Sequence, residues 1–175
     1  EEITTTHSRG SEQVVTTDHF EYDHMGRLTK QTQDLDGKTE VIASNSYDEL
    51  GQLISKGVGN TEGSGRLQTV DYQYNIRGWL KKINEPSSLG NDLFGFEIKY
   101  NDIADSTKKL FNGNISQTAW NTKSVNSTTN PVSSQYTYSY DALNRITGAT
   151  DNTTNYNVSG IVYDQHGNIT KLVRK

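Results

Sequence analysis

A short pattern recurs along the 175-residue chain and restricts the folds that the chain can adopt. It reads Tyr, Asp or Asn, two variable residues, Gly or Asn, one further residue, and then Leu or Ile, as in the stretch from Tyr22 to Leu28. One such match would carry little information, but a recurring one indicates a structural unit used repeatedly. The repeat residues are Tyr22, Asp23, Gly26 and Leu28; Tyr47, Asp48, Gly51 and Leu53; Tyr74, Asn75, Gly78 and Leu80; Tyr100, Asn101, Gly113 and Ile115; Tyr140, Asp141, Asn144 and Ile146; and Tyr163, Asp164, Gly167 and Ile169.

The spacing of the copies is regular except at one place. Successive repeat tyrosines are 25, 27, 26, 40 and 23 residues apart. The copy that begins at Tyr100 is broken by an insertion in its turn at 102–112, and a polar connection at 121–134 leads to the next copy. We therefore expect about six hairpins over residues 13–175, preceded by a flexible N-terminal extension at 1–12.

Each copy is predicted to form a β-hairpin. Asp or Asn at the first turn position suits a type I turn, because its side-chain oxygen can accept a backbone N–H within the turn. Gly, or Asn144 in one copy, tolerates the positive φ that such a turn needs. A plain two-residue loop would pair Tyr22 with Arg27, whereas a three-residue loop with a G1 bulge would pair Tyr22 with Leu28. We expect the bulged register, because it places the tyrosine and the following Leu or Ile on one face of the sheet.

The rest of the chain is also typical of an all-β protein. Short runs rich in Tyr, Val, Ile and Thr alternate with clusters of Gly, Asn and Asp. No window has a sustained apolar period of 3.6 residues, so we expect at most one helical turn, between Ile103 and Phe111. The predicted fold is one curved, open antiparallel sheet of successive hairpins. A β-propeller is disfavoured, because two hairpins per blade would give too few blades to close a ring.

Composition argues against several classes of function. The chain has no Cys, which excludes disulfide scaffolds and zinc–thiolate sites, and its net charge of −4 argues against a general nucleic-acid binder. No apolar run approaches the ~20 residues of a membrane-spanning helix. The four histidines lack ligand spacing, and the stretch from Asp34 to Gly37 lacks the later Glu of a calcium loop. We expect no catalytic residue, no metal site and no cofactor.

The repeat resembles that of the Rhs/YD-repeat family, over about Gln13 to Lys175. The pattern Tyr-Asp-x-x-Gly-[Arg/Asn]-[Leu/Ile] is that family's signature, and the stretch from Tyr72 to Leu80 is similar to the form found in Bacteroidetes. The resemblance implies shell repeats of the bacterial polymorphic-toxin or wall-associated type. Such hairpins would form a continuous β-sheet, as a segment of a β-cocoon that encloses a C-terminal toxin.

This resemblance sets the expected function. The chain would be a non-catalytic structural segment of a secreted or cell-surface bacterial protein, building a shell that encapsulates or displays a C-terminal toxin or effector. Its expected partners are the remaining repeats and the effector domain of the same polypeptide, together with further copies that pair through open sheet edges. Neither a nucleic-acid partner nor a membrane span is expected.

Two other functions remain open. Trp79 and Trp120 could stack on sugar rings, which would make the chain a surface carbohydrate-binding or adhesion module, although aromatic residues in repeats more often pack on their neighbours. An enzyme such as a hydrolase is disfavoured, because no combination of nucleophile, base and orienting residue is recognisable.

Overall fold

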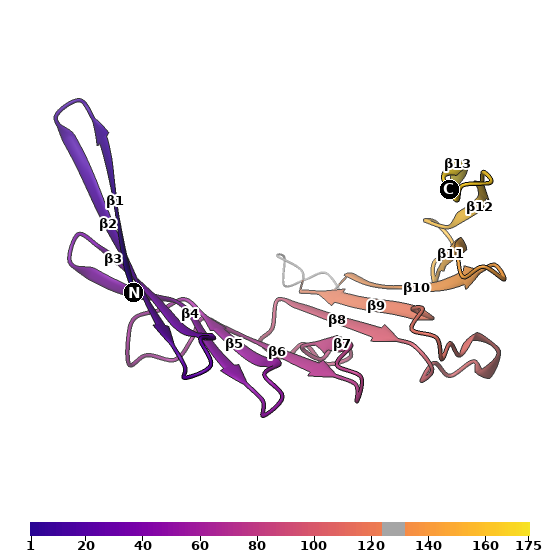
Figure 1. Cartoon of the computed structure of the whole chain (residues 1–175), viewed down its shortest axis with the longest axis horizontal. Helices are drawn as coiled ribbons and strands as arrows, with labels where there is room; N and C mark the ends of the chain where they lie inside the picture. The colour runs from indigo at the N-terminus through magenta and orange to yellow at the C-terminus, as the bar shows by residue number, and fades with distance from the viewer. Residues whose placement is uncertain (124–131) are drawn as a thin grey trace. The chain divides into compact units, whose positions relative to one another are not determined.

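The computed structural model describes residues 1–123 and 132–175, and its secondary structure is almost entirely β. Thirteen antiparallel strands follow one another in chain order in one open sheet, which confirms the predicted fold class (Figure 1). A 3-10 helix, η1 (Ser106–Lys108), lies in the insertion, where one helical turn was expected. The strands are β1 (Glu2–Arg9), β2 (Glu12–Tyr22), β3 (Leu28–Leu35), β4 (Lys38–Tyr47), β5 (Leu53–Val58), β6 (Gln68–Tyr74), β7 (Leu80–Ile83), β8 (Phe94–Lys99), β9 (Gln117–Thr122), β10 (Val132–Tyr140), β11 (Ile146–Asp151), β12 (Val158–Tyr163) and β13 (Ile169–Arg174).

The chain divides into two compact units. The first, Glu1–Gln73, holds β1 to β5 and all of β6 except its last residue, and the second, Tyr74–Lys175, holds the remaining strands. Within each unit, the contacts between strands in the described residues join strands that are neighbours in the sheet. Strands arranged in this way bury little of either face, so the buried hydrophobic side chains of the described residues are few. They are Val41 and Ala43 in the first unit and Tyr100, Ile103 and Ala149 in the second.

The bulged register predicted for the repeat is confirmed in the copies whose pairing is described. In each of these hairpins the ladder shifts register beside the tyrosine, as a β-bulge requires. Directly opposed residues on antiparallel strands point to the same face, so each tyrosine shares a face with the Leu or Ile that follows. The opposed pairs are Tyr22 with Leu28, Tyr47 with Leu53, Tyr140 with Ile146, and Tyr163 with Ile169.

The N-terminal residues differ from the expectation of an extension outside the repeats. Residues Glu2 to Arg9 form β1, which pairs with β2 along its full length, from Glu2 opposite His19 to Arg9 opposite Glu12. The sequence does not indicate this strand, because Thr4, Thr5 and Thr6 lack the alternation of apolar and polar residues that marks a half-buried strand. All side chains of β1 are exposed, so backbone pairing rather than burial defines the strand.

The connections between repeats are of several kinds. Asp36 and Gly37 have φ values of 49° and 76° and join Leu35 to Lys38, which makes a two-residue hairpin turn between the first and second copies. The polar connection expected at 121–134 is shorter than predicted, because 121–122 lie in β9 and 132–134 lie in β10. Residues 124–131 lie outside the described part of the chain.

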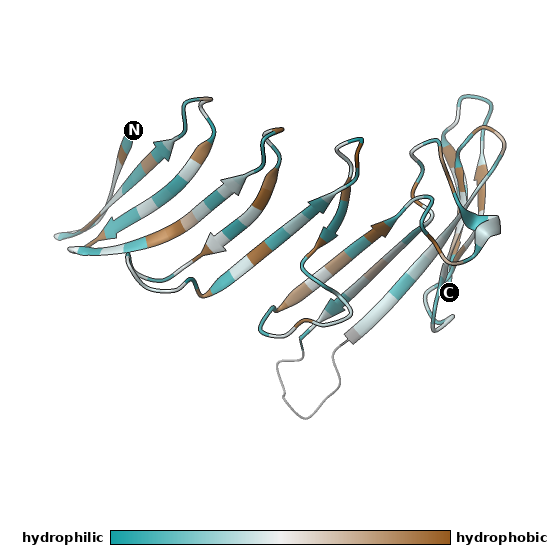
Figure 2. Ribbon diagram, turned by 90° about the horizontal axis from the view of Figure 1, so that it is seen from below, coloured by the Kyte–Doolittle hydropathy of each residue, from teal (hydrophilic) through white to brown (hydrophobic). Residues whose placement is uncertain are grey.

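Hydrophobic and hydrophilic residues alternate along many of the strands, as Figure 2 shows. The alternation is clear in β6, where burial switches at every residue from Gln68 to Tyr74. The apolar face is nevertheless only partly covered, since Tyr22 is 47% exposed and Ile169 is 54% exposed. The repeat therefore specifies a sheet with two different faces, of which the apolar one remains accessible to solvent in the described structure.

Candidate functional site: the junctions between repeats

Five of the six turns share the same set of hydrogen bonds. In the first copy, Asp23 Oδ1 accepts the backbone N–H groups of Met25 and Arg27, each at 2.9 Å. The backbone also closes the turn, with Gly26 N donating to Asp23 O and Asp23 N donating to Arg27 O, both at 3.0 Å. The same four bonds recur in the turns that begin at Asp48, Asn75, Asp141 and Asp164.

The fourth turn position has a positive φ in each of these turns. It is 76° at Gly26 and 62° at Asn144, the one non-glycine residue there, as predicted from its tolerance of this region. Asn144 also has a role that the sequence analysis missed. Its Oδ1 accepts the side-chain amides of Asn112 at 2.7 Å and Asn114 at 3.3 Å, so it ties the turn to the end of the insertion. Glycine at this position could not form these bonds.

Hydrogen bonds within the turn lower the pKa of three turn carboxylates, those of Asp23, Asp141 and Asp164. The backbone N–H of Arg27 is the main cause that lowers the pKa of Asp23, and the backbone N–H of Arg145 does the same for Asp141. The side-chain amide of Asn168 is the main cause that lowers the pKa of Asp164. These carboxylates recur because each turn uses them as acceptors, which agrees with their interpretation as structural residues.

The repeat tyrosines link one repeat to the one before it. The hydroxyl of Tyr47 donates to the backbone oxygen of Leu28 at 2.8 Å, and Leu28 is the last residue of the preceding repeat pattern. The same bond recurs along the chain, which sequence reasoning missed. The sequence carries one signal of this bond, because every copy has tyrosine where phenylalanine would supply the same ring without a hydroxyl. Further bonds of this kind run from Tyr100 to Leu80 (3.2 Å), from Tyr140 to Ile115 (2.8 Å) and from Tyr163 to Ile146 (2.6 Å).

In the first and fifth copies, the arginine after the turn glycine or asparagine makes a second link between repeats. Arg27 places its guanidinium 4.7 Å from the ring centroid of Tyr47, and its Nε donates to Asp23 Oδ2 at 2.6 Å. Arg145 repeats both contacts, at 4.5 Å from the ring of Tyr163 and 2.7 Å from Asp141. Each arginine therefore joins its own turn to the tyrosine of the next repeat.

Tryptophan takes this position in the third copy. The ring centroids of Trp79 and Tyr100 are 5.1 Å apart, and the angle between the two ring planes is 48°. This tilted pair thus replaces the arginine–tyrosine contact of the first and fifth copies. The guanidinium of Arg77 lies over the ring of Trp79, 5.1 Å from the ring centroid. The Trp79 side chain is therefore contacted by residues of its own unit. Trp79 therefore packs on Tyr100 and Arg77, and it also lines a cleft.

The broken copy keeps the tyrosine junction and loses the compact turn. Tyr100 is buried, and its backbone oxygen accepts Leu110 N at 3.0 Å and also contacts the hydroxyl of Ser116. Asp105 caps η1 by accepting Thr107 N at 2.9 Å. Gly113 keeps a positive φ of 97°, as expected for the residue that ends the turn. The insertion is therefore folded locally around the end of β8.

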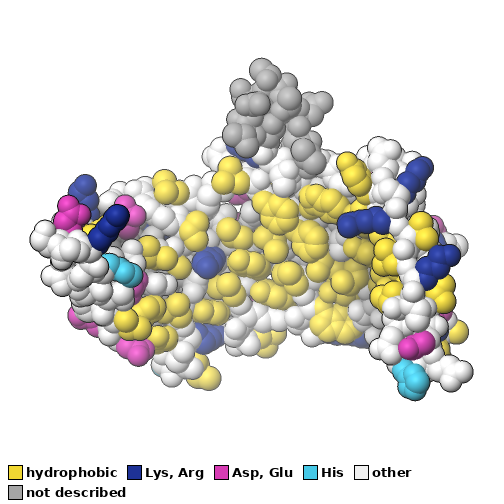
Figure 3. All heavy atoms as spheres, turned by 90° about the horizontal axis from the view of Figure 1, so that it is seen from above, with side chains coloured by type: hydrophobic (Ala, Val, Ile, Leu, Met, Phe, Trp, Pro, Cys, Tyr) yellow, Lys and Arg dark blue, Asp and Glu magenta, His cyan; other side chains and the backbone are white. Residues whose placement is uncertain are grey.

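Trp120 lies apart from the turns, on the face of the sheet in the second unit. Its ring stacks on Tyr136 at 5.7 Å, and Tyr136 stacks on Tyr138 at 6.4 Å. Phe96 lies directly opposite Trp120 in the ladder, so these residues share one face, which we call the aromatic face. Figure 3 shows many hydrophobic side chains exposed in the view that it draws. The two tryptophans thus lie in different surroundings, one at a turn and one on the sheet face.

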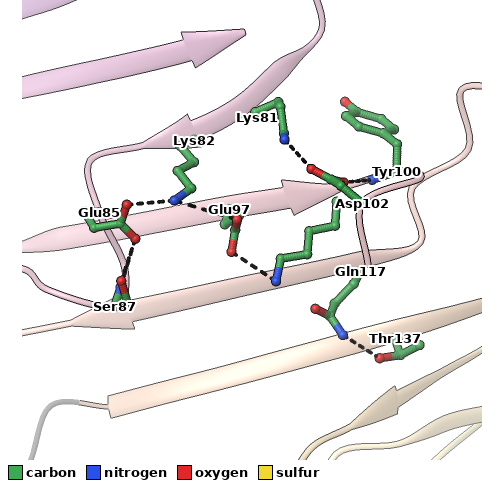
Figure 4. Close-up of polar contacts among 10 residues, drawn as sticks. Lys81, Lys82, Glu85, Ser87, Glu97, Tyr100, Asp102, Gln117 and Thr137 are labelled. Carbon is green, nitrogen blue, oxygen red and sulfur yellow. Dashed lines mark hydrogen bonds and ion pairs between the residues drawn. The ribbon is translucent and has the colours of Figure 1, made fainter. Parts of the chain in front are cut away.

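Figure 4 shows polar contacts around β7 and β8, where Glu97 and Lys99 lie on the face of β8 opposite to Phe96. Lys82 Nζ lies 3.8 Å from Glu97 Oε1 and 2.7 Å from Glu85 Oε2. Lys99 Nζ lies 3.5 Å from Glu97 Oε2. The hydrogen bond with Glu85 is the main cause that raises the pKa of Lys82. These contacts connect β7, β8 and the loop that follows β7, and they give the sheet one charged face and one aromatic face.

Among residues 1–123 and 132–175, no group of three His, Cys, Asp or Glu side chains is placed to hold a metal ion. His19 lies in β2, with Nε2 3.0 Å from Asp34 and Nδ1 3.6 Å from Glu2. In the part of the chain that the structure covers, no helix has the length and apolar character needed to cross a membrane.

Comparisons with known proteins give only weak likenesses. No family model and no curated protein matches the chain. Among solved structures, a chain of the TcdB2-TccC3-Cdc42 crystal structure matches with a TM-score of 0.49 and 15% identity, over 99% of this chain and 11% of that chain. A chain of the Photorhabdus luminescens Tc holotoxin pore, with a mutated TccC3, matches with a TM-score of 0.45 and 15% identity, over 92% of this chain and 9% of that one. This chain therefore spans about a tenth of the length of these solved chains.

Proposed function

We propose that this chain is a non-catalytic wall segment of a secreted or surface Rhs/YD-repeat protein, in which successive hairpins build a shell that encapsulates or displays a C-terminal toxin or effector. The observation that carries the proposal is the repeated junction. Each described junction uses a tyrosine hydroxyl and a backbone oxygen, such as Tyr47 with Leu28 and Tyr163 with Ile146. A unit that forms the same bond to its predecessor can be added many times, which is what a wall needs.

The two faces of the second unit support the same proposal. A wall that encloses a polypeptide has one face toward the cargo and one toward water. The polar face with Lys82, Glu97 and Lys99 suits contact with water, whereas the aromatic face with Trp120 and Tyr136 suits contact with a polypeptide. The family assignment, the cocoon and the toxin are parts of the proposal that rest on the repeat motif.

The test is protease protection in the complete protein that contains this segment. We expect any domain that follows the repeats to resist digestion while the wall is intact. In a variant with phenylalanine at Tyr47, Tyr100, Tyr140 and Tyr163, digestion of that domain should become faster, because four junction hydrogen bonds are lost. Equal digestion rates for the enclosed domain and the same domain alone would contradict encapsulation.

A carbohydrate-binding or adhesion module is the second candidate. It is favoured by one observation, a cleft beside Trp79 with an arginine at its rim. A catalytic function has no such support from the contacts of the described residues.

A further inference from the structure

A small cleft lies between the turn of the third copy and the insertion of the broken copy. Its volume is about 160 Å³, and its walls include aromatic, amide and guanidinium groups. Every one of its residues belongs to the second unit. The residues that matter here are Asn75, Arg77, Trp79, Tyr100, Asn101 and Phe111.

The insertion builds one wall of this cleft. Arg77 Nη1 donates to the backbone oxygen of Phe111 at 3.3 Å, which ties the insertion to the turn. Gly113 lies so close to Trp79 that a Cβ atom there would be 2.9 Å from the indole. The corresponding space between the first two turns, beside Arg27, has no such wall and measures about 540 Å³. In repeat proteins, insertions often mark the binding side.

The charge of the third turn differs from that of the other copies. In the first and fifth copies, Arg27 and Arg145 are neutralised by the turn aspartates. The third copy has Asn75 in place of the aspartate, and its arginine, Arg77, comes before the turn glycine rather than after it. Among the described residues, no carboxylate forms an ion pair with Arg77 as the aspartates do with Arg27 and Arg145. The result is a cation beside an aromatic ring, in a cleft that lacks a negative charge of its own.

We propose that this cleft binds a sugar ring that carries a carboxylate, a uronate. The guanidinium of Arg77 would pair with the carboxylate, and the indole of Trp79 would contact the apolar side of the ring. The side-chain amides of Asn75 and Asn101 supply donors for hydroxyl groups. The volume is about half the lower limit of typical ligand pockets, ~300 Å³, which suits one ring better than a longer ligand.

A peptide is a poorer fit for the same cleft. Extended peptides bind most simply by adding a strand to a free sheet edge. The strands beside the cleft, β7 and β8, each lie between two neighbouring strands, so neither offers a free edge. A peptide that ends in an apolar residue could bring only its terminal carboxylate and one side chain, and this alternative is an outcome of the test below.

The experiment is a titration with D-glucuronate and D-galacturonate, followed by the indole N–H signals in two-dimensional NMR. The chain has two tryptophans, so a Trp120→Phe variant assigns the signal of Trp79. We expect a uronate to shift the Trp79 signal with a Kd of about 1 mM, and glucose to bind at least tenfold more weakly. Arg77→Gln should weaken uronate binding at least tenfold, because a charge-assisted hydrogen bond is lost.

Lys109→Gln is the matched control, because it removes a cation of the insertion that does not line the cleft. It should leave uronate binding unchanged. If Arg77→Gln does not fold, Asn101→Ala tests the same cleft and should weaken uronate and glucose alike. The proposal is wrong if neither uronate shifts the Trp79 signal at a uronate concentration 20-fold above about 1 mM. It is also wrong if Arg77→Gln and Lys109→Gln change uronate binding equally, or if N-acetyl-leucine binds more tightly than either uronate. None of these results would bear on the wall function, which does not involve a sugar.

Discussion

At the scale of the residue, each position of the repeat has a separate physical role. The aspartate accepts two backbone N–H groups, the glycine supplies a positive φ, and the tyrosine and the following Leu or Ile face one another across the bulge. The same side chains also serve the neighbouring repeat, through the tyrosine hydroxyl and the arginine. One short motif therefore specifies both the hairpin and its attachment.

The turn acceptor can be tested at Asp48, which accepts Leu50 N at 3.0 Å and Gln52 N at 2.8 Å. We expect Asp48→Ala to lower the free energy of unfolding by about 1–2 kcal/mol, because both donors lose their partner. Asp48→Asn should cost less than about half of that, since Asn75 makes the same two bonds in the third copy. Urea unfolding of the three proteins measures this, and equal losses for both variants would contradict the acceptor role.

The turn carboxylates also predict how stability depends on pH. The pKa values of Asp23, Asp141 and Asp164 are lowered in the folded chain, so their ionised forms favour folding. This stabilisation is complete above the unfolded value of about 3.9 and is lost as the pH falls through the lower folded values. We expect the thermal midpoint to be nearly constant from about pH 7 to 5 and to fall below about pH 4.

The control for this pH dependence replaces the three aspartates with asparagine, as in Asn75 of the third copy. This variant should lose less stability than the wild type between about pH 5 and pH 3. Identical acid-induced shifts of the two midpoints would show that these carboxylates do not cause the pH dependence.

At the scale of the element, the junction between hairpins depends on one hydroxyl per repeat. Tyr47 Oη donates to Leu28 O at 2.8 Å, and Asn45 Nδ2 donates to the same oxygen at 2.9 Å. Leu28 O is thus held by two side chains of the following strand, β4. The junction adds side-chain bonds beyond the described end of the ladder between β3 and β4, where Lys30 lies opposite Ser44.

We expect Tyr47→Phe to lower the free energy of unfolding by about 0.5–1.5 kcal/mol and to speed amide exchange near Leu28. Tyr22→Phe is the matched control, because the hydroxyl of Tyr22 reaches only the exposed carboxylate of Glu1, at 3.2 Å. That change should stay within about 0.5 kcal/mol. Hydrogen exchange and denaturant unfolding distinguish the two. A loss at Tyr22 as large as at Tyr47 would argue against a specific junction.

At the scale of the whole molecule, the sheet is open and ends in β1 and β13. Every residue of β1 and of β13 is exposed. Open edges with accessible backbone groups favour pairing between chains. The wall proposal gives these edges a use, because further repeats would pair with them.

We therefore expect concentration-dependent self-association, visible in sedimentation velocity. Val173→Lys, in β13, should weaken it, because a charged side chain on an edge strand opposes pairing. Leu143→Lys is the control, since Leu143 is 71% exposed at a turn tip rather than on the edge. A strictly monomeric profile at high concentration, or equal effects of the two lysines, would contradict association through this edge.

The repeat could be interpreted from the sequence because its information is local. Seven consecutive residues were enough to predict the turn, its bulge and the shared face of Tyr22 and Leu28, and the structure confirms that register. The expected insertion and its helical turn are also present, as η1. The strand at Glu2–Arg9 was missed because its pairing with β2 uses backbone groups, which leave no pattern in the side chains.

The contacts between repeats could be decided only by the tertiary structure. Tyr47 and Leu28 are 19 residues apart, and Asn112 and Asn144 are 32 apart, so no local pattern shows that they meet. The sequence alone determined the hairpin, because turn chemistry and alternation act over a few neighbouring residues. Only the folded chain decided which hydroxyl meets which carbonyl, which arginine covers which ring and where the insertion lies, because these contacts depend on the register between separate hairpins.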